Sequence, residues 1–247
     1  MGILRVKGIV IKEVHTEEAD KIITIYAKDK GKISAYAKGA RRPRSRLIAG
    51  TQLFCYSEFI LFTGREIYNI SSCELIEPFY GIRDDMNKLT YAAYILSLVE
   101  DVLQENQSLN KVLKLFLNAL YLLSDSDKSP ELIARIFELR FISILGYTPV
   151  IGTCVSCNNQ CTGELFSYKL GGSICQHCSN KDMSCISISA GTVKALEHII
   201  KSSKNELFSF GVSPMVLKEL EIVNRNYLKD KLEKDYNKLD FLKKFNC

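Results

Sequence analysis

The chain has 247 residues, a formal net charge of +5 and 47% apolar residues. A composition this apolar excludes an intrinsically disordered chain, and the length suffices for one large or two to three small domains. The longest membrane-like run, YAAYILSLV at 91–99, is too short to span a bilayer, and the first residues lack the apolar stretch of a signal peptide. We therefore expect a soluble, cytoplasmic protein whose nine cysteines are reduced.

Residues 1–79 carry the pattern of β-strands. Five runs rich in β-branched and aromatic residues are separated by turn signals and by one long basic segment. Five short strands with a long connection between the third and the fourth favour a small barrel, for which the OB-fold is the leading topology and an SH3-like barrel the alternative. The predicted strands are 4–14, 21–28, 31–39, 51–62 and 65–77.

The long connection is unusually basic. The first 50 residues hold 12 basic and 5 acidic residues, and four of the ten arginines lie in KGARRPRSR at 38–46, which we call the basic loop. The planar guanidinium group matches phosphate oxygens two at a time, so this composition favours contact with a phosphate backbone over a solvated loop with incidental charge. The predicted nucleic-acid contacts are Lys38, Arg41, Arg42, Arg44 and Arg46.

Aromatic residues in the barrel are mostly expected in its core, because a barrel this small fills its interior with side chains. Tyr36 is the exception. In GKISAYAKG it alternates with the apolar Ile33, Ala35 and Ala37, which places it on the outward side of the strand with Ser34 and Lys38. We predict that Tyr36 stacks on a nucleic-acid base.

Residues 80–247 change to a helical period. Apolar residues recur at steps of three and four from residue 84 onward. Ser129 is the predicted N-cap of the helix that begins with Pro130 and Glu131, and Gly146 is its predicted stop. Further helical runs lie at 108–124, 189–202 and 213–230.

Four cysteines in two C-x2-C pairs predict one tetrahedral zinc ion in a module at about 152–182 within the helical region. The cysteines are Cys154, Cys157, Cys175 and Cys178, and Cys161 or His177 could replace one of them. Four thiolates fill the coordination shell, and no His-x-Glu or His-Glu-x-x-His pattern occurs in the cysteine-rich segment, so a structural ion is favoured over a catalytic one.

Three stretches together resemble the RecO family of bacterial DNA repair proteins. They are KGIVIKEVHTEEADKIITIYAKDKGKISAYAKGARRPRSR at 7–46, ELRFISILGYTPVIGTCVSC at 138–157 and GGSICQHC at 171–178. The resemblance implies an OB-fold DNA-binding domain at 1–79, a helical domain at 80–247 with an embedded four-cysteine zinc finger, and no enzymatic activity. No phosphate-binding G-x-x-x-x-G-K-[ST] motif occurs in the sequence, which agrees with that expectation.

The resemblance also implies a nucleoid-associated recombination mediator. Such a protein binds single- and double-stranded DNA, anneals complementary strands, and helps to load the RecA recombinase onto DNA coated by single-strand-binding protein. The implied partners are RecR, the C-terminal tail of single-strand-binding protein, RecF in some bacteria and, indirectly, RecA. From the residues alone, an RNA- or ribosome-associated protein with an OB-fold and a zinc ribbon is the alternative, and a zinc enzyme or a protein adaptor is less favoured.

Overall fold

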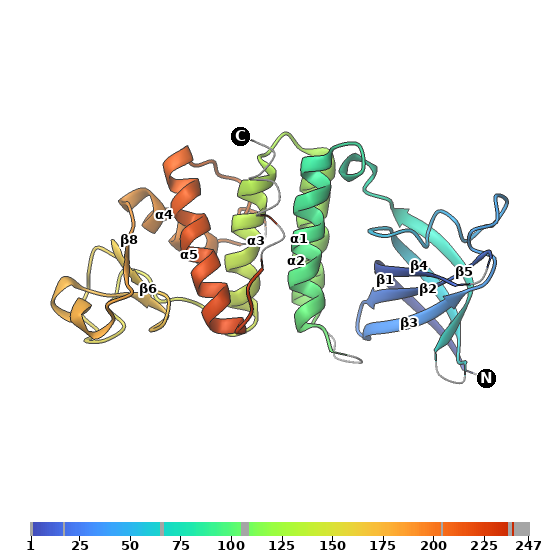
Figure 1. The fold of residues 1–247 in the computed structure, drawn as a ribbon, viewed down its shortest axis with the longest axis horizontal. Coiled ribbons are helices and arrows are strands. Elements are labelled where there is room, and N and C mark those ends of the chain that lie inside the picture. The colour runs from blue at the N-terminus through green and yellow to red at the C-terminus, as the bar shows by residue number, and fades with distance from the viewer. Residues whose placement is uncertain are drawn as a thin grey trace. The chain divides into compact units, whose positions relative to one another are not determined.

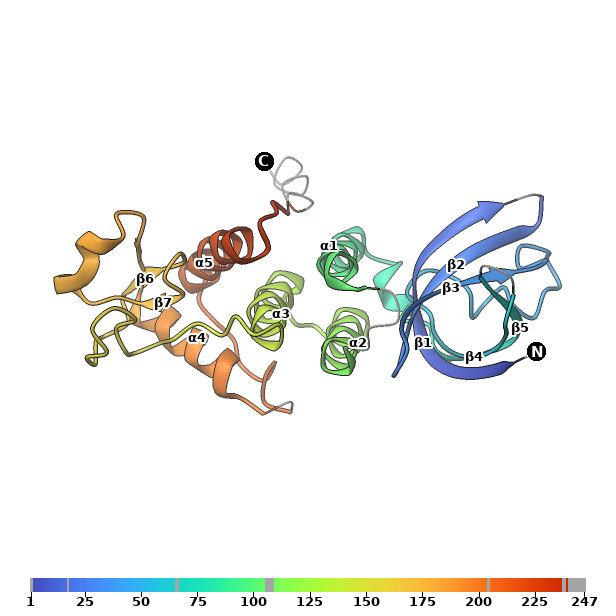
Figure 2. The ribbon, with the colours of Figure 1, turned by 90° about the horizontal axis from the view of Figure 1, so that it is seen from below.

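The computed structural model describes residues 2–16, 18–64, 67–104, 109–203, 205–236 and 239. The chain divides into two compact units, of which the first comprises residues 1–89 and 96–125 and the second residues 90–95 and 126–247. Figures 1 and 2 together label the helices and strands of both units. The predicted functional boundary after residue 79 remains a prediction. Within the described part of the chain, each helix is too short or too polar to cross a bilayer.

Five strands of the first unit form a closed barrel in the order β1-β2-β3-β5-β4. Neighbouring strands run antiparallel except for β3 and β5, which pair in parallel through Ala35 and Tyr36. Figure 2 shows β1 curving around the barrel. This strand order confirms the predicted OB-fold and rejects the SH3-like alternative. The strands are β1 (Ile3–Thr16), β2 (Asp20–Ala27), β3 (Gly31–Ala37), β4 (Tyr56–Phe62) and β5 (Tyr68–Glu77).

Every second side chain of β3 points into the barrel and helps to fill its interior. In β3, Ile33, Ala35 and Ala37 are buried, whereas Ser34 and Tyr36 are half-buried on the outer side. The buried set packs with residues of the other strands into one apolar core. Gly8 of β1 is required where β1 passes β2, because a Cβ there would lie 2.8 Å from the Tyr26 carbonyl oxygen.

The fourth strand begins later than predicted. Residues 51–55 form turns, and β4 starts at Tyr56. Phe54 adopts a positive φ of 67°, which interrupts an extended strand, and its side chain is buried. The apolar composition of this segment therefore reflects a buried turn and not the start of a strand.

Two helices complete the first unit and follow a short 3-10 turn, η1 (Tyr80–Ile82). Asp85 caps the first helix, because its carboxylate accepts the backbone N–H groups of Asn87 at 2.7 Å and Lys88 at 3.2 Å. The helices are α1 (Met86–Val102), of which residues 90–95 belong to the second unit, and α2 (Asn110–Asp125).

The second unit joins three helices to a small cysteine-rich module. Ser129 caps the first of these helices by accepting the Leu132 N–H at 3.4 Å, and the helix stops before Gly146, whose φ is 102°, so both predicted ends are confirmed. The helices are α3 (Pro130–Ile144), α4 (Ala190–Lys201) and α5 (Pro214–Leu232). The module contains β6 (Leu165–Ser167), β7 (Gly172–Ser173), β8 (Ile186–Ser187) and the 3-10 helix η2 (Gln176–Lys181).

A buried ion pair holds the helices of the second unit together. Arg135 and Glu138 of α3 are joined at 2.6 Å, and neither is more than 4% exposed. Tyr94 of α1 donates its hydroxyl to the Glu138 carboxylate, and the Asn224 amide of α5 donates to the same carboxylate at 3.0 Å. Three helices are thus tied to one carboxylate.

Candidate nucleic-acid interface and metal centre

The basic loop is anchored by one buried carboxylate at the start of β2. Asp20 accepts the backbone N–H of Gly39 at 2.6 Å through one oxygen and the hydroxyl of Tyr36 through the other. Gly39 has a φ of 64°, a conformation that favours glycine and that turns the chain sharply as it leaves β3. The Tyr36 hydroxyl, the Gly39 N–H and the nearby charges of Lys38 and Arg42 lower the pKa of Asp20, so it is ionised at neutral pH.

Backbone hydrogen bonds then fix the first half of the loop beside the β1–β2 turn. The Arg41 N–H donates to the Ala19 carbonyl at 2.9 Å, and the Arg41 guanidinium donates to the Glu18 carbonyl at 3.3 Å. The Arg42 N–H donates to Gly39 at 3.1 Å, and the Ser45 N–H donates to Arg42 at 2.9 Å. The basic loop is therefore a series of turns and not an open coil.

The charged side chains of the basic loop face solvent. Lys38 and the four arginines are all exposed. Among the described residues, none of these five side chains forms an ion pair with a carboxylate. The structure thus places the five predicted basic residues on one exposed loop, where the Arg41 guanidinium also donates to the Glu18 carbonyl.

Tyr36 lies where the alternation of β3 predicts, on the outer side and half-buried. Its hydroxyl donates to the Asp20 carboxylate, and in the strand register Tyr36 pairs with Ile22 of β2 and Asn69 of β5. Through its hydrogen bond to Asp20, Tyr36 therefore also helps to position the basic loop. Base stacking by Tyr36 remains a prediction.

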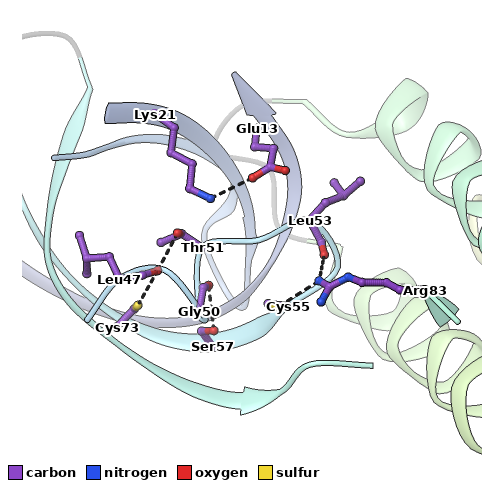
Figure 3. Close-up of polar contacts among 10 residues, drawn as sticks. All are labelled: Glu13, Lys21, Leu47, Gly50, Thr51, Leu53, Cys55, Ser57, Cys73 and Arg83. Atoms are coloured by element: carbon purple, nitrogen blue, oxygen red, sulfur yellow. Dashed lines mark hydrogen bonds and ion pairs between the residues drawn. The ribbon is translucent and has the colours of Figure 1, made fainter. Parts of the chain in front are cut away.

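The second half of the connection is fixed inside the barrel. Figure 3 shows the Thr51 hydroxyl donating to the Leu47 carbonyl at 2.7 Å and the Ser57 hydroxyl donating to the Gly50 carbonyl at 3.0 Å. Arg83 follows η1 and donates to the Leu53 carbonyl at 2.7 Å. Leu47 itself belongs to the barrel core. Both ends of the basic loop are consequently held, and the exposed arginines lie between them.

The four predicted cysteines converge in the second unit. The sulfur atoms of Cys154, Cys157, Cys175 and Cys178 all lie within 4.8 Å of one another. The group includes neither Cys161, which packs against its apolar side, nor the exposed His177. Cys154 and Cys178 are buried, and Cys157 is exposed. The two C-x2-C pairs thus supply the complete four-sulfur set.

The spacing of these thiols suits a metal ion. A tetrahedral Zn²⁺ with Zn–S bonds of about 2.3 Å places its sulfurs about 3.8 Å apart. The Cys157 and Cys175 sulfurs lie 3.8 Å apart. Burial raises the pKa of Cys154, but backbone N–H groups of Cys175, Cys157 and Ser156 outweigh it and lower the pKa to about 6. A backbone hydrogen bond lowers the pKa of Cys157, but hydrogen bonds with Cys154, Cys175 and Cys178 raise it overall, so the metal-free group favours a single thiolate at Cys154.

Local backbone contacts bring the two cysteine pairs together. The Cys154 N–H donates to Asn159 and the Asn158 N–H donates to Cys154, both at 2.9 Å, so the first pair sits on a tight turn. Gly172 must be glycine before the second pair, because a Cβ there would lie 2.3 Å from the Val150 carbonyl oxygen. The Ser173 N–H then donates to that carbonyl at 2.8 Å.

A closed five-stranded barrel with an exposed arginine loop, followed by a helical region that contains a four-cysteine cluster, defines an OB-fold protein with a cysteine-rich module. The family model described as Recombination protein O N terminal matches residues 1–79, and the model described as Recombination protein O C terminal matches residues 83–240. The chain belongs to the RecO family of DNA repair proteins.

Curated relatives match the chain nearly from end to end. A DNA repair protein RecO of Acetivibrio thermocellus is 52% identical over 244 residues, which cover 98% of this chain and 97% of the relative. A DNA repair protein RecO of Alkaliphilus metalliredigens is 36% identical over 244 residues, which cover 98% of this chain and 99% of the relative. A third relative of the same name, from Symbiobacterium thermophilum, is 31% identical over 98% of this chain and 97% of the relative.

Proposed function

We propose that the chain is a recombination mediator that acts without catalysis in the cytoplasm, in association with the nucleoid. It binds single- and double-stranded DNA, anneals complementary strands and, with RecR and in some settings RecF, helps to load RecA onto DNA coated by single-strand-binding protein. The observation that carries the proposal is the basic loop, whose four exposed arginines are held at both ends and form no ion pair with a described carboxylate.

The mechanism is electrostatic. Two DNA strands repel each other through their phosphates, and neutralising part of that charge on a protein surface lowers the cost of bringing them together. The contacts to DNA come from Lys38, Arg41, Arg42, Arg44 and Arg46, and Tyr36 adds stacking. Because contacts to the backbone carry no base information, the sequence preference is weak and the affinity falls steeply with salt.

The four cysteines hold one structural zinc ion. Thiolates occupy all four positions of a tetrahedral shell, so the ion supplies folding energy to the module and leaves no position for a substrate. The geometry that supports this proposal is the four-sulfur group within 4.8 Å.

The proposal is tested with complementary strands coated by single-strand-binding protein, whose annealing is followed by fluorescence with and without RecR. We expect the chain to accelerate annealing and the charge-reversed variant Arg41→Glu, Arg42→Glu, Arg44→Glu, Arg46→Glu to lose most of the acceleration. Equal competition by RNA of the same length for the binding site, together with no acceleration of annealing, would point instead to the RNA-associated alternative.

A further inference from the structure

A second group of basic side chains lies at the opposite end of β3 from the basic loop. Three come from the β2–β3 turn and the start of β3, and two come from the first turns of α2, all within the first unit. Four of them are exposed and Lys32 is half-buried. We call this group the lysine cluster: Lys28, Lys30, Lys32, Lys111 and Lys114.

Direct hydrogen bonds join the β2–β3 turn to the beginning of α2. The hydroxyl of the buried Tyr26 donates to the Leu109 carbonyl at 2.7 Å. The Asp29 N–H donates to the Asn110 side-chain oxygen at 3.1 Å, and the Asn110 amide donates in return to the Asp29 carboxylate. Two lysine-bearing segments that lie about 80 residues apart in sequence are thereby held next to each other.

The charge of the lysine cluster is not neutralised by its surroundings within the described structure. None of its five side chains forms an ion pair with a described residue. The carboxylate of the turn, Asp29, is bonded to a neutral amide, and α2 carries no acidic residue before Asp125. Lys111 and Lys114 lie three residues apart and therefore project from the same face of α2.

The outer face of β3 connects the lysine cluster to the basic loop. Lys32, Ser34 and Tyr36 alternate with buried residues on this face, and Lys38 follows directly after the strand. The six steps from Lys32 to Lys38 correspond to about 20 Å of extended chain. The nearby carboxylate of Asp20 is buried and accepts two hydrogen bonds, so it opposes a polyanion on this face less than an exposed acid would.

From this arrangement we infer that the lysine cluster binds phosphates of the same single strand that the basic loop holds, so that the strand runs along the outer face of β3 from one basic group to the other. This inference rests on the proposed function. The path fits the site sizes of about 4–16 nucleotides that single OB-folds occupy. It predicts that the two basic groups act together on a long strand and that a short strand uses the basic loop alone.

Three double variants with the same change in net charge test the inference. Lys30→Gln with Lys114→Gln alters the lysine cluster, and Arg42→Gln with Arg44→Gln alters the basic loop. Lys194→Gln with Lys218→Gln is the matched control, because both lysines are exposed on helices of the second unit and form no ion pair with a described residue. Affinity is measured by fluorescence anisotropy as a function of salt, with oligothymidylates of about 5 and about 16 nucleotides.

The lysine-cluster variant is expected to lower the salt slope for the long strand by about 1.4, since each lost phosphate contact on a single strand removes about 0.7. The lysine-cluster variant should bind the short strand with wild-type affinity. The basic-loop variant should bind both the short and the long strand more weakly than the wild type. If the lysine-cluster variant has the same affinity and salt slope as the control for the long strand, the inference is wrong and the proposed function is unaffected. Equal losses on both strands also overturn the single path, and a basic-loop variant with unchanged binding removes the proposed function itself.

Discussion

Removing the metal from the four-cysteine cluster is expected to unfold the surrounding module and leave the barrel intact. The module has strands of only three, two and two residues, and its apolar cluster centres on Cys154, Ile174 and Cys178. A sheet this short is not stable by itself. A structural zinc ion contributes about 10–16 kcal/mol in zinc-finger peptides at neutral pH, which equals or exceeds the roughly 5–15 kcal/mol that stabilise a whole domain.

Amide hydrogen exchange before and after chelation measures this effect residue by residue. The Ser173 and Ile174 N–H groups, which donate to Val150 and Leu165 at 2.8 and 2.9 Å, report on the module. The Phe54 N–H, which donates to the Val10 carbonyl at 2.9 Å, reports on the barrel. We expect the first two to lose protection and the third to keep it. Protection of Ser173 and Ile174 that survives metal removal would refute the reasoning.

The ligand assignment has its own matched control. Cys157→Ser removes one of the four converging sulfurs, so the purified protein should lose its bound zinc. Cys161→Ser changes a cysteine that packs beside the cluster without belonging to the four-sulfur group, so it should keep one zinc ion per chain. Zinc content by atomic emission distinguishes the two, and loss of zinc in both variants would contradict the assignment.

Two further predictions concern stability and pH. Glu138→Ala leaves Arg135 buried without its ion-pair partner and should lower the free energy of unfolding by about 3–5 kcal/mol, measured by urea denaturation; a loss below about 1 kcal/mol would contradict the role of the pair. Asp20→Asn leaves Tyr36 or Gly39 without its acceptor and should accelerate exchange of the Gly39 amide. The pKa of Asp20 is lower in the folded protein than its unfolded value of about 3.9. The stabilisation that the Asp20 carboxylate provides is therefore complete above the unfolded pKa and is lost as pH falls through the folded pKa. We accordingly expect the exchange protection of the wild-type Gly39 amide to be constant between about pH 5 and 8. Protection that is lost within that range would count against Asp20 as the anchor.

Strand patterns and cysteine spacing predicted the barrel and the four-cysteine cluster because both depend on local periodicity or on short, fixed spacings, and the zinc ion itself stays a prediction. The start of β4 was predicted wrongly, since the buried turn at Phe54 has the same apolar composition as a strand. Asp20 could not be identified as the anchor of the basic loop, because its partner Gly39 lies 19 residues away and meets it only when the barrel closes. Sequence patterns likewise gave no sign that Arg135 and Glu138 of α3 form a buried pair and not an exposed one.

The lysine cluster shows the same limit more clearly. Lysines of the β2–β3 turn and of α2 are unremarkable surface residues in their own segments, and hydrogen bonds of Tyr26, Asp29 and Asn110 bring the two segments together. The basic loop was predictable because its charges are contiguous in sequence. A basic surface that is assembled by tertiary contacts can be recognised only from the folded structure.

The most direct test of the account is the salt dependence of single-strand binding with the arginines of the basic loop neutralised. Arg41→Gln, Arg42→Gln, Arg44→Gln, Arg46→Gln should reduce the slope of log affinity against log salt by about 2.8, because four phosphate contacts of about 0.7 each are lost. Affinity at moderate salt should fall severalfold while the thermal transition stays in place. An unchanged slope with unchanged affinity would mean that these guanidinium groups do not hold the nucleic acid.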